Sequence, residues 1–140
     1  MSGIITKVIE LQKKWLPSQL GILFIMPMFL FAGLHKLFNY TDTWKSFHLR
    51  FLKKLNLPSL VSQYIISYVI LIEVLSPIIV GYSYLNPRES NATFMRIIAI
   101  ASLVIFTIIS TILYHPPTQD QTHFMKNLAV IGGLILALHQ

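Results

Sequence analysis

The stretch that decides the fold runs from Ile97 to Tyr114 and reads IIAIASLVIFTIISTILY. It holds 18 residues without a charged side chain, which is about the length that a helix needs to cross a bilayer. The whole chain has the same character, because 54% of its 140 residues are hydrophobic, only 11% are charged and the mean hydropathy is +0.65. A soluble domain of this size is rarely so apolar. The sequence therefore predicts an all-α integral membrane protein.

Three further apolar stretches predict additional membrane spans, at residues 20–38, 64–84 and 123–139. Pro27 in the first predicts a kink and not a break, since neighbouring helices can satisfy the carbonyl that proline leaves free. In the last, only Leu128 to Leu138 is continuously apolar, which is about 16 Å of helix against roughly 30 Å of hydrocarbon. This segment is either re-entrant or begins near His123 and carries Lys126 and Asn127 into the membrane. We favour the second, which gives a four-helix bundle and one membrane domain over residues 1–140.

Two amphipathic segments lie outside these spans. Residues 1–19 form a basic arm, which differs from a mitochondrial presequence in containing Glu10 and no arginine. Residues 41–56 predict a short basic helix on the membrane surface between the first two spans. Its apolar side chains, expected to point into the membrane, are Trp44, Phe47, Phe51 and Leu55. Its basic side chains are expected to contact lipid head groups and, together with Trp44, to form a lipid-binding surface. They are Lys45, Arg50, Lys53 and Lys54.

The charge balance and the absence of cysteine limit the possible functions. The chain has 11 basic and 5 acidic residues, a net charge of +6. In so apolar a chain this excess indicates topology and lipid contact, not nucleic-acid binding. The basic residues divide almost equally between the two sides of the predicted bundle, so they do not predict its orientation. Because the chain has no cysteine, disulfides, thiolate catalysis, iron–sulfur ligation and zinc sites built on cysteine are excluded.

The alternating direction of the spans predicts a polar cluster at one membrane face. The end of the first span, the start of the second, the end of the third and the start of the fourth share that face. We expect Glu73, deeper in the membrane, to pair with Lys36 or Lys126, because lipid cannot solvate an isolated carboxylate. Such a pair could simply fix the helix register, or it could belong to a pocket for a head group or cofactor. The expected members of the interior site are Lys36, Glu73, Lys126, Asn127, His35 and His115.

The remaining motifs predict packing more clearly than chemistry. His35 and His115 lack a spacing diagnostic of haem or metal, so no metal site is predicted and hydrogen bonding at the interface is the simpler interpretation. No nucleophile–base arrangement, paired carboxylate or phosphate-binding glycine loop is evident, so no catalytic residue is predicted. Small residues mark positions where membrane helices can approach closely. The candidates for such positions are Gly33, Gly81, Gly132 and Gly133.

Four segments together resemble the DoxX family of small four-helix membrane proteins. They are FAGLHKLF at residues 31–38, Glu73 followed by Gly81, His115-Pro116, and FMKNLAVIGGL at residues 124–134, which is the most specific. The resemblance covers about Leu20 to Leu138. It implies a four-helix bundle with a shared interior site formed by Gly33, Lys36, Glu73, Lys126 and Asn127.

The resemblance also implies a role beside other membrane proteins. DoxX-like proteins look like membrane partners of redox systems, some linked to quinone reduction during thiosulfate oxidation, and eukaryotic relatives include a receptor-assembly chaperone and a cargo receptor of the endoplasmic reticulum. We therefore expect an accessory, non-catalytic subunit of a redox or respiratory assembly, whose interior site binds a quinone or a phospholipid head group. The alternative is a membrane chaperone, cargo receptor or structural scaffold. The expected location is the mitochondrial inner membrane or the bacterial plasma membrane, with the endoplasmic reticulum as the alternative.

Overall fold

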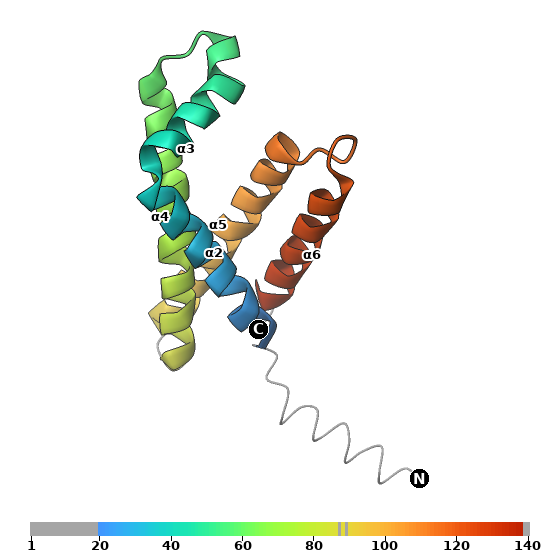
Figure 1. Ribbon diagram of the computed structural model, residues 1–140. Helices are drawn as coiled ribbons and strands as arrows, with labels where there is room; N and C mark the ends of the chain where they lie inside the picture. The colour runs from blue at the N-terminus through green and yellow to red at the C-terminus, as the bar shows by residue number, and fades with distance from the viewer. Residues whose placement is uncertain (1–19, 87, 89, 139–140) are drawn as a thin grey trace.

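The computed structural model describes residues 20–86, 88 and 90–138 (Figure 1). These residues form helices joined by short connections and include no β-strand, so the all-α prediction is confirmed. The predicted arm at residues 1–19 and the last residue of the predicted fourth span lie outside this described part of the chain. The elements in chain order are the α-helix α2 (Leu20–Phe38), the α-helix α3 (Tyr40–Phe47), the π-helical turn η1 (His48–Leu52), the 3₁₀ turn η2 (Lys53–Leu55), and the α-helices α4 (Ser59–Leu85), α5 (Ser90–Tyr114) and α6 (Gln121–Leu138).

Three helices in the described part of the chain, α2, α4 and α5, are long and apolar enough to cross a membrane. Helix α2 has the bounds expected for the first span and continues through Pro27. Helices α4 and α5 begin at Ser59 and Ser90, before the expected positions 64 and 97. Hydropathy marks only the apolar part of a helix, whereas the helix itself can start in the polar residues that precede it. Helix α6 is less apolar because it carries Lys126 and Asn127 in its second turn.

The long helices run back and forth, and Figure 1 shows their arrangement. Helices α2 and α4 lie against each other, α5 and α6 lie against each other, and the two pairs diverge toward the end of the molecule that carries α3. The end of α2, the start of α4, the end of α5 and the start of α6 all lie toward that end. We call it the α3 end.

Below the point where the pairs diverge, α2, α4, α5 and α6 share one apolar core. Its centre is formed by Ile100 and Leu103 of α5 and Leu134 of α6, none of which is exposed. Branched aliphatic side chains of this kind fill the space between helices at a density close to that of organic crystals. The other buried members of this core are Ile22, Met26, Phe29, Val80, Ala99 and Ala137.

A second, smaller core lies at the α3 end, where residues 40–55 fold back onto α4. Phe47 and Leu52 are buried against Ile66 and Ile70. This corrects the expectation that the whole apolar stripe points into the membrane, since Phe47 points into the protein. Helical spacing groups side chains on one face, but it does not say whether lipid or another helix covers that face. The stretch then ends at Asn56, whose φ of 54° lies in the left-handed region, and Pro58 precedes the first residue of α4.

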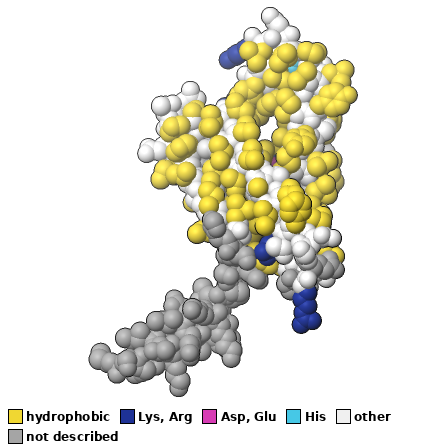
Figure 2. Space-filling view, turned by 180° about the vertical axis from the view of Figure 1, so that it is seen from behind, with side chains coloured by type: hydrophobic (Ala, Val, Ile, Leu, Met, Phe, Trp, Pro, Cys, Tyr) yellow, Lys and Arg dark blue, Asp and Glu magenta, His cyan; other side chains and the backbone are white. Residues whose placement is uncertain are grey.

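Large apolar side chains cover the outside of the molecule, as Figure 2 shows for one face. Phe24 and Phe38 of α2 and Leu85 of α4 each expose about four-fifths of their surface, at 79%, 82% and 82%. Monomeric soluble proteins seldom expose so much contiguous apolar surface. The surface is therefore suited to a lipid bilayer, in agreement with the predicted membrane environment.

A candidate ligand cavity between the helices

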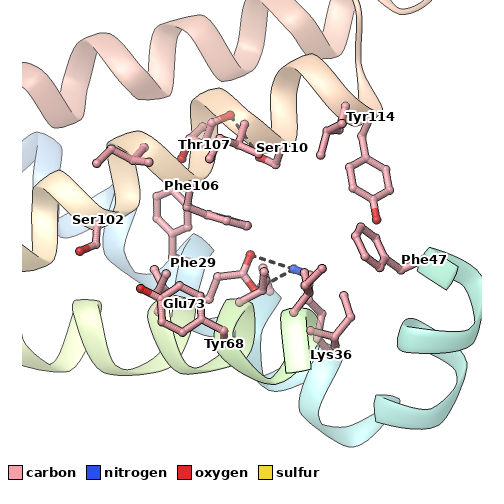
Figure 3. A pocket seen from close by; sticks show the side chains of 18 of the residues that line it. Phe29, Lys36, Phe47, Tyr68, Glu73, Ser102, Phe106, Thr107, Ser110 and Tyr114 are labelled. Atoms are coloured by element: carbon pink, nitrogen blue, oxygen red, sulfur yellow. Dashed lines mark hydrogen bonds and ion pairs between the residues drawn. The ribbon is translucent and has the colours of Figure 1, made fainter. Parts of the chain in front are cut away.

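A cavity of about 900 Å³ is lined by residues of α2, α3, α4, α5 and α6. Its wall is mostly apolar, and aromatic rings of α2, α3, α4 and α5 point toward it in Figure 3. Cavities that hold small organic molecules generally measure about 300–1,000 Å³ and combine an apolar wall with a few polar groups. The polar residues of this wall are Lys36, Thr43, Tyr64, Tyr68, Glu73, Ser102, Thr107, Ser110, Tyr114, His115 and Asn127.

The strongest polar feature of the wall is an ion pair between α2 and α4. Lys36 Nζ lies 2.8 Å from Oε1 and 2.7 Å from Oε2 of Glu73 (Figure 3). The Glu73 side chain is 3% exposed and the Lys36 side chain 28% exposed. An ammonium group has three N–H donors, so its two hydrogen bonds to the carboxylate leave one donor for another acceptor. The carboxylate is neutralised, whereas the lysine keeps some access to the cavity.

Gly33, one turn before Lys36, lets α2 come close enough to α4 for this pair to form. A Cβ atom at Gly33 would lie 2.8 Å from Val74 Cγ2 and 2.9 Å from Glu73 Cβ. Only glycine fits at this distance, because real Cβ atoms essentially never come so close to other atoms. The close helix approach expected of Gly33 is therefore present beside the ion pair itself.

The structure does not pair Lys126 with Glu73, which corrects the expectation that either lysine could do so. Lys126 is exposed, and Asn127 lines the cavity in its place. Along α6 the residues that face the cavity or the core include Asn127, Val130, Leu134 and Ala137, and Lys126 lies one position before the first of them. One residue turns a helix by about 100°, so an error of one position moves Lys126 out of the site.

His35 and two of the four glycines also lie away from the expected contacts. His35 is exposed on α2 and does not line the cavity. A Cβ atom at Gly81 or Gly132 would meet nothing within 4 Å, so these two do not mark close packing within the described part of the chain. A Cβ atom at Gly133 would lie 2.7 Å from Ile25 Cδ1, so α6 approaches α2 closely there.

The residues expected at the lipid surface divide into two groups. Arg50 lies over the rings of Phe51 and Tyr114, at 5.5 and 5.2 Å from their centroids, and these two rings meet edge to face at 5.0 Å. Arg50 therefore helps to connect residues 40–55 with α5 beside the cavity. Lys45 lies 5.9 Å from the ring centroid of Trp44, which is partly buried against the second core. Lys45, Lys53 and Lys54 are exposed, as Arg50 also is.

Asp120 is a polar residue that the sequence did not single out. Its two carboxylate oxygens accept hydrogen bonds from Nδ1 of His115 at 2.8 Å and Nδ1 of His123 at 2.9 Å. These hydrogen bonds lower the pKa of Asp120 to about 2, and the hydrogen bond from His123 has the largest effect. The signal that could have found it is an aspartate just before a helix, with a histidine three residues later.

The chemistry of the cavity wall favours binding: hydroxyl groups, an amide and one ion pair can donate and accept hydrogen bonds around an apolar interior. Comparisons of the chain with models of known protein families, with curated proteins and with solved structures find no match. The function is therefore inferred from the cavity and the residues around it.

Proposed function

We propose that this chain is a DoxX-like membrane protein that crosses the bilayer four times and serves as a non-catalytic subunit of a redox or respiratory assembly. In this proposal the cavity beside Lys36 and Glu73 holds the ring of a quinone. The observation that carries the proposal is an apolar cavity whose strongest polar group is a neutralised ion pair with a spare hydrogen-bond donor.

The packing of α6 supports a fourth span. Its 18 residues make a helix of about 27 Å, close to the thickness of the hydrocarbon core. Leu134 and Ala137 belong to the same core as side chains of α2, α4 and α5. A helix that shares this core lies at the same depth as its neighbours. Lys126 is near the α3 end of α6, from where its long side chain can reach the membrane surface.

The charge of the ion pair favours a quinone over a phospholipid head group. Lys36 and Glu73 together carry no net charge, so a phosphate would bring an unbalanced negative charge close to the carboxylate. A quinone carbonyl is a neutral acceptor that can take the third N–H of Lys36. The amide of Asn127 also lines the cavity and offers further donors, whereas the hydroxyl of Ser110 donates to the carbonyl of Thr107 at 3.1 Å and can accept a hydrogen bond.

The cavity reaches the outer surface of the bundle between α4 and α5. Several of its lining residues are more than half exposed: Tyr64 and Tyr68 on α4 at 71% and 66%, and Ile105 and Ile109 on α5 at 59% and 52%. In a bilayer, lipid tails would lie against this opening. It suits a molecule with a polar ring and a long apolar tail, because the tail can extend into the membrane while the ring stays inside.

The test uses the purified full chain in lipid nanodiscs and decylubiquinone, a quinone with a short tail. Ser110→Phe places a ring in the cavity wall, and the matched control Ile112→Phe places one on the same helix at a residue that is 65% exposed and does not line the cavity. Decylubiquinone should raise the melting temperature of the wild type and of Ile112→Phe, and leave that of Ser110→Phe unchanged. Mass spectrometry of organic extracts should find co-purified quinone in the first two proteins only.

Other outcomes would contradict the quinone site. A thermal shift with phospholipid and none with decylubiquinone would make the cavity a lipid site. No shift with either molecule, and empty extracts, would leave Lys36 and Glu73 as a structural pair. Isolation of the chain in stoichiometric complex with other membrane proteins would then favour the scaffold or chaperone alternative.

A further inference from the structure

A second polar cluster lies in the connection between α5 and α6, on residues that the ion pair does not involve. His115 follows the last residue of α5, Asp120 precedes the first residue of α6, and His123 lies in the first turn of α6. The two imidazole rings stack with centroids 4.9 Å apart and an interplanar angle of 20°. Both rings approach the same carboxylate, one on each oxygen.

A helix cap does not account for this arrangement. As a cap, Asp120 needs only to accept the backbone N–H of His123, which lies 3.2 Å from Oδ1. The two side-chain contacts from His115 and His123 are additional, and they bring two imidazole nitrogens and a carboxylate oxygen within 4.8 Å of one another. Two imidazoles and one carboxylate are the ligands of many zinc and non-haem iron sites.

We propose that His115, Asp120 and His123 bind one divalent transition-metal ion of the zinc class. Metal–ligand bonds of about 2.0–2.2 Å place tetrahedral ligand atoms about 3.3–3.5 Å apart. The two imidazole nitrogens contact different oxygens of Asp120, at 2.8 and 2.9 Å, and three ligand atoms, one from each residue, lie within 4.8 Å of one another. Rotation of these partly exposed side chains about their torsion angles would bring the three atoms to the spacing that the ion requires.

The connection between the helices holds the three side chains near this geometry. The backbone N–H groups of Gln119 and Asp120 both donate to the carbonyl of Pro116, at 3.0 Å each. Pro116 and Pro117 further limit the conformations of the unbound chain, so less entropy is lost when a ligand binds. The side chains are also accessible, with 33% exposure for His115 and Asp120 and 56% for His123.

Three protein ligands leave a coordination position open for water or another molecule. His115 also lines the large cavity, so the ion would sit at the edge of that cavity. The proposed metal site uses His115, Asp120 and His123 and does not depend on the proposed quinone function. Ser110→Phe, which fills the cavity wall, should leave metal binding unchanged.

The test is a titration of the full chain, without a polyhistidine tag, with Co²⁺ and then Zn²⁺. The wild type should bind one equivalent of Co²⁺ with visible d–d absorption, and Zn²⁺ should displace it. His123→Gln and Asp120→Asn should each weaken binding by at least about tenfold. His35→Gln removes an exposed histidine far from the cluster in sequence and should bind as the wild type does.

Asp120→Asn keeps an oxygen that can cap α6, and His123→Gln changes an exposed position, so both variants should fold; helical circular dichroism checks this. Less than half an equivalent of Co²⁺ bound by the wild type would overturn the proposal. So would equal binding by wild type, His123→Gln and Asp120→Asn, or a loss in His35→Gln as large as in His123→Gln.

Discussion

Gly33 in α2 lies so close to Glu73 in α4 that a Cβ atom at Gly33 would come within 2.9 Å of the Cβ atom of Glu73. The ion pair between Lys36 and Glu73 is formed one turn further along α2. The close approach at Gly33 and the ion pair of Lys36 with Glu73 therefore belong to the same contact between α2 and α4.

Gly33→Ala should destabilise the bundle by about 1–3 kcal/mol, the usual cost of extra volume in a packed core. The added methyl group would also approach the Glu73 backbone carbon at 3.2 Å, and backbone yields less readily than a side chain. Reversible unfolding in sodium dodecyl sulfate measures the change. Gly81→Ala in α4 is the control, because its Cβ atom would meet nothing within 4 Å. Equal stability of the two variants would show that α2 and α4 are further apart than described.

Lys36→Met should be more damaging than the same change at the other lysine of the expected site. It leaves the buried Glu73 carboxylate without a counter-ion, a loss that is typically about 3–5 kcal/mol. Lys126→Met should stay within about 0.5 kcal/mol, as is usual for exposed positions. A double-mutant cycle with Glu73→Gln gives the coupling energy between each lysine and the carboxylate. Coupling of Glu73 to Lys126 and not to Lys36 would contradict the observed pairing.

The adjacent glycines of α6 should respond in opposite directions to a methyl group. Gly132→Ala adds one where nothing lies within 4 Å, so the better helix propensity of alanine should stabilise the protein by up to about 1 kcal/mol. Gly133→Ala places its methyl group 2.7 Å from Ile25 Cδ1, so the Ile25 side chain must move. We expect Gly133→Ala to be less stable than Gly132→Ala in the same unfolding assay. The reverse order would mean that α6 is rotated relative to α2.

Tyr114→Ala should loosen residues 40–55 from the rest of the molecule. The Phe51 and Tyr114 rings meet edge to face at 5.0 Å, an interaction of about 0.5–1.5 kcal/mol beyond burial alone. When local opening limits cleavage, this energy predicts a two- to tenfold faster tryptic cut, by order of magnitude, after Lys53 or Lys54. Tyr64→Ala is the control, since Tyr64 is 71% exposed. Unchanged cleavage of Tyr114→Ala would show that the ring contact does not hold the segment.

Hydropathy predicted the positions of the long helices well because each of them contains a continuous apolar segment that is visible in the sequence. Over the described residues the first predicted span coincides with α2, and the fourth was predicted to begin two residues after the start of α6. The starts of α4 and α5 were placed too late, since Ser59 and Ser90 precede the apolar part of each helix. Helix ends depend on local backbone hydrogen bonds, which hydropathy does not report.

The candidate site was predicted only in part, because its assembly depends on how each helix is rotated. Lys36 and Glu73 were correctly expected to be possible partners, since both must avoid lipid. Lys126 was a wrong partner because α6 turns Asn127 inward instead. The contact of Asp120 with two histidines could not be predicted from spacing alone, because it depends on the path of the connection between α5 and α6.

The Lys36–Glu73 pair gives the bundle a defined electrical property in an energised membrane. A transmembrane voltage acts on net charge, with about 2.3 kcal/mol for each elementary charge that crosses 100 mV. The pair holds one positive and one negative charge at 2.7 Å, so the field does almost no net work when α2 and α4 move together. We therefore expect the voltage to act on a variant that keeps only one of the two charges, and we expect no such effect from this pair in the wild type.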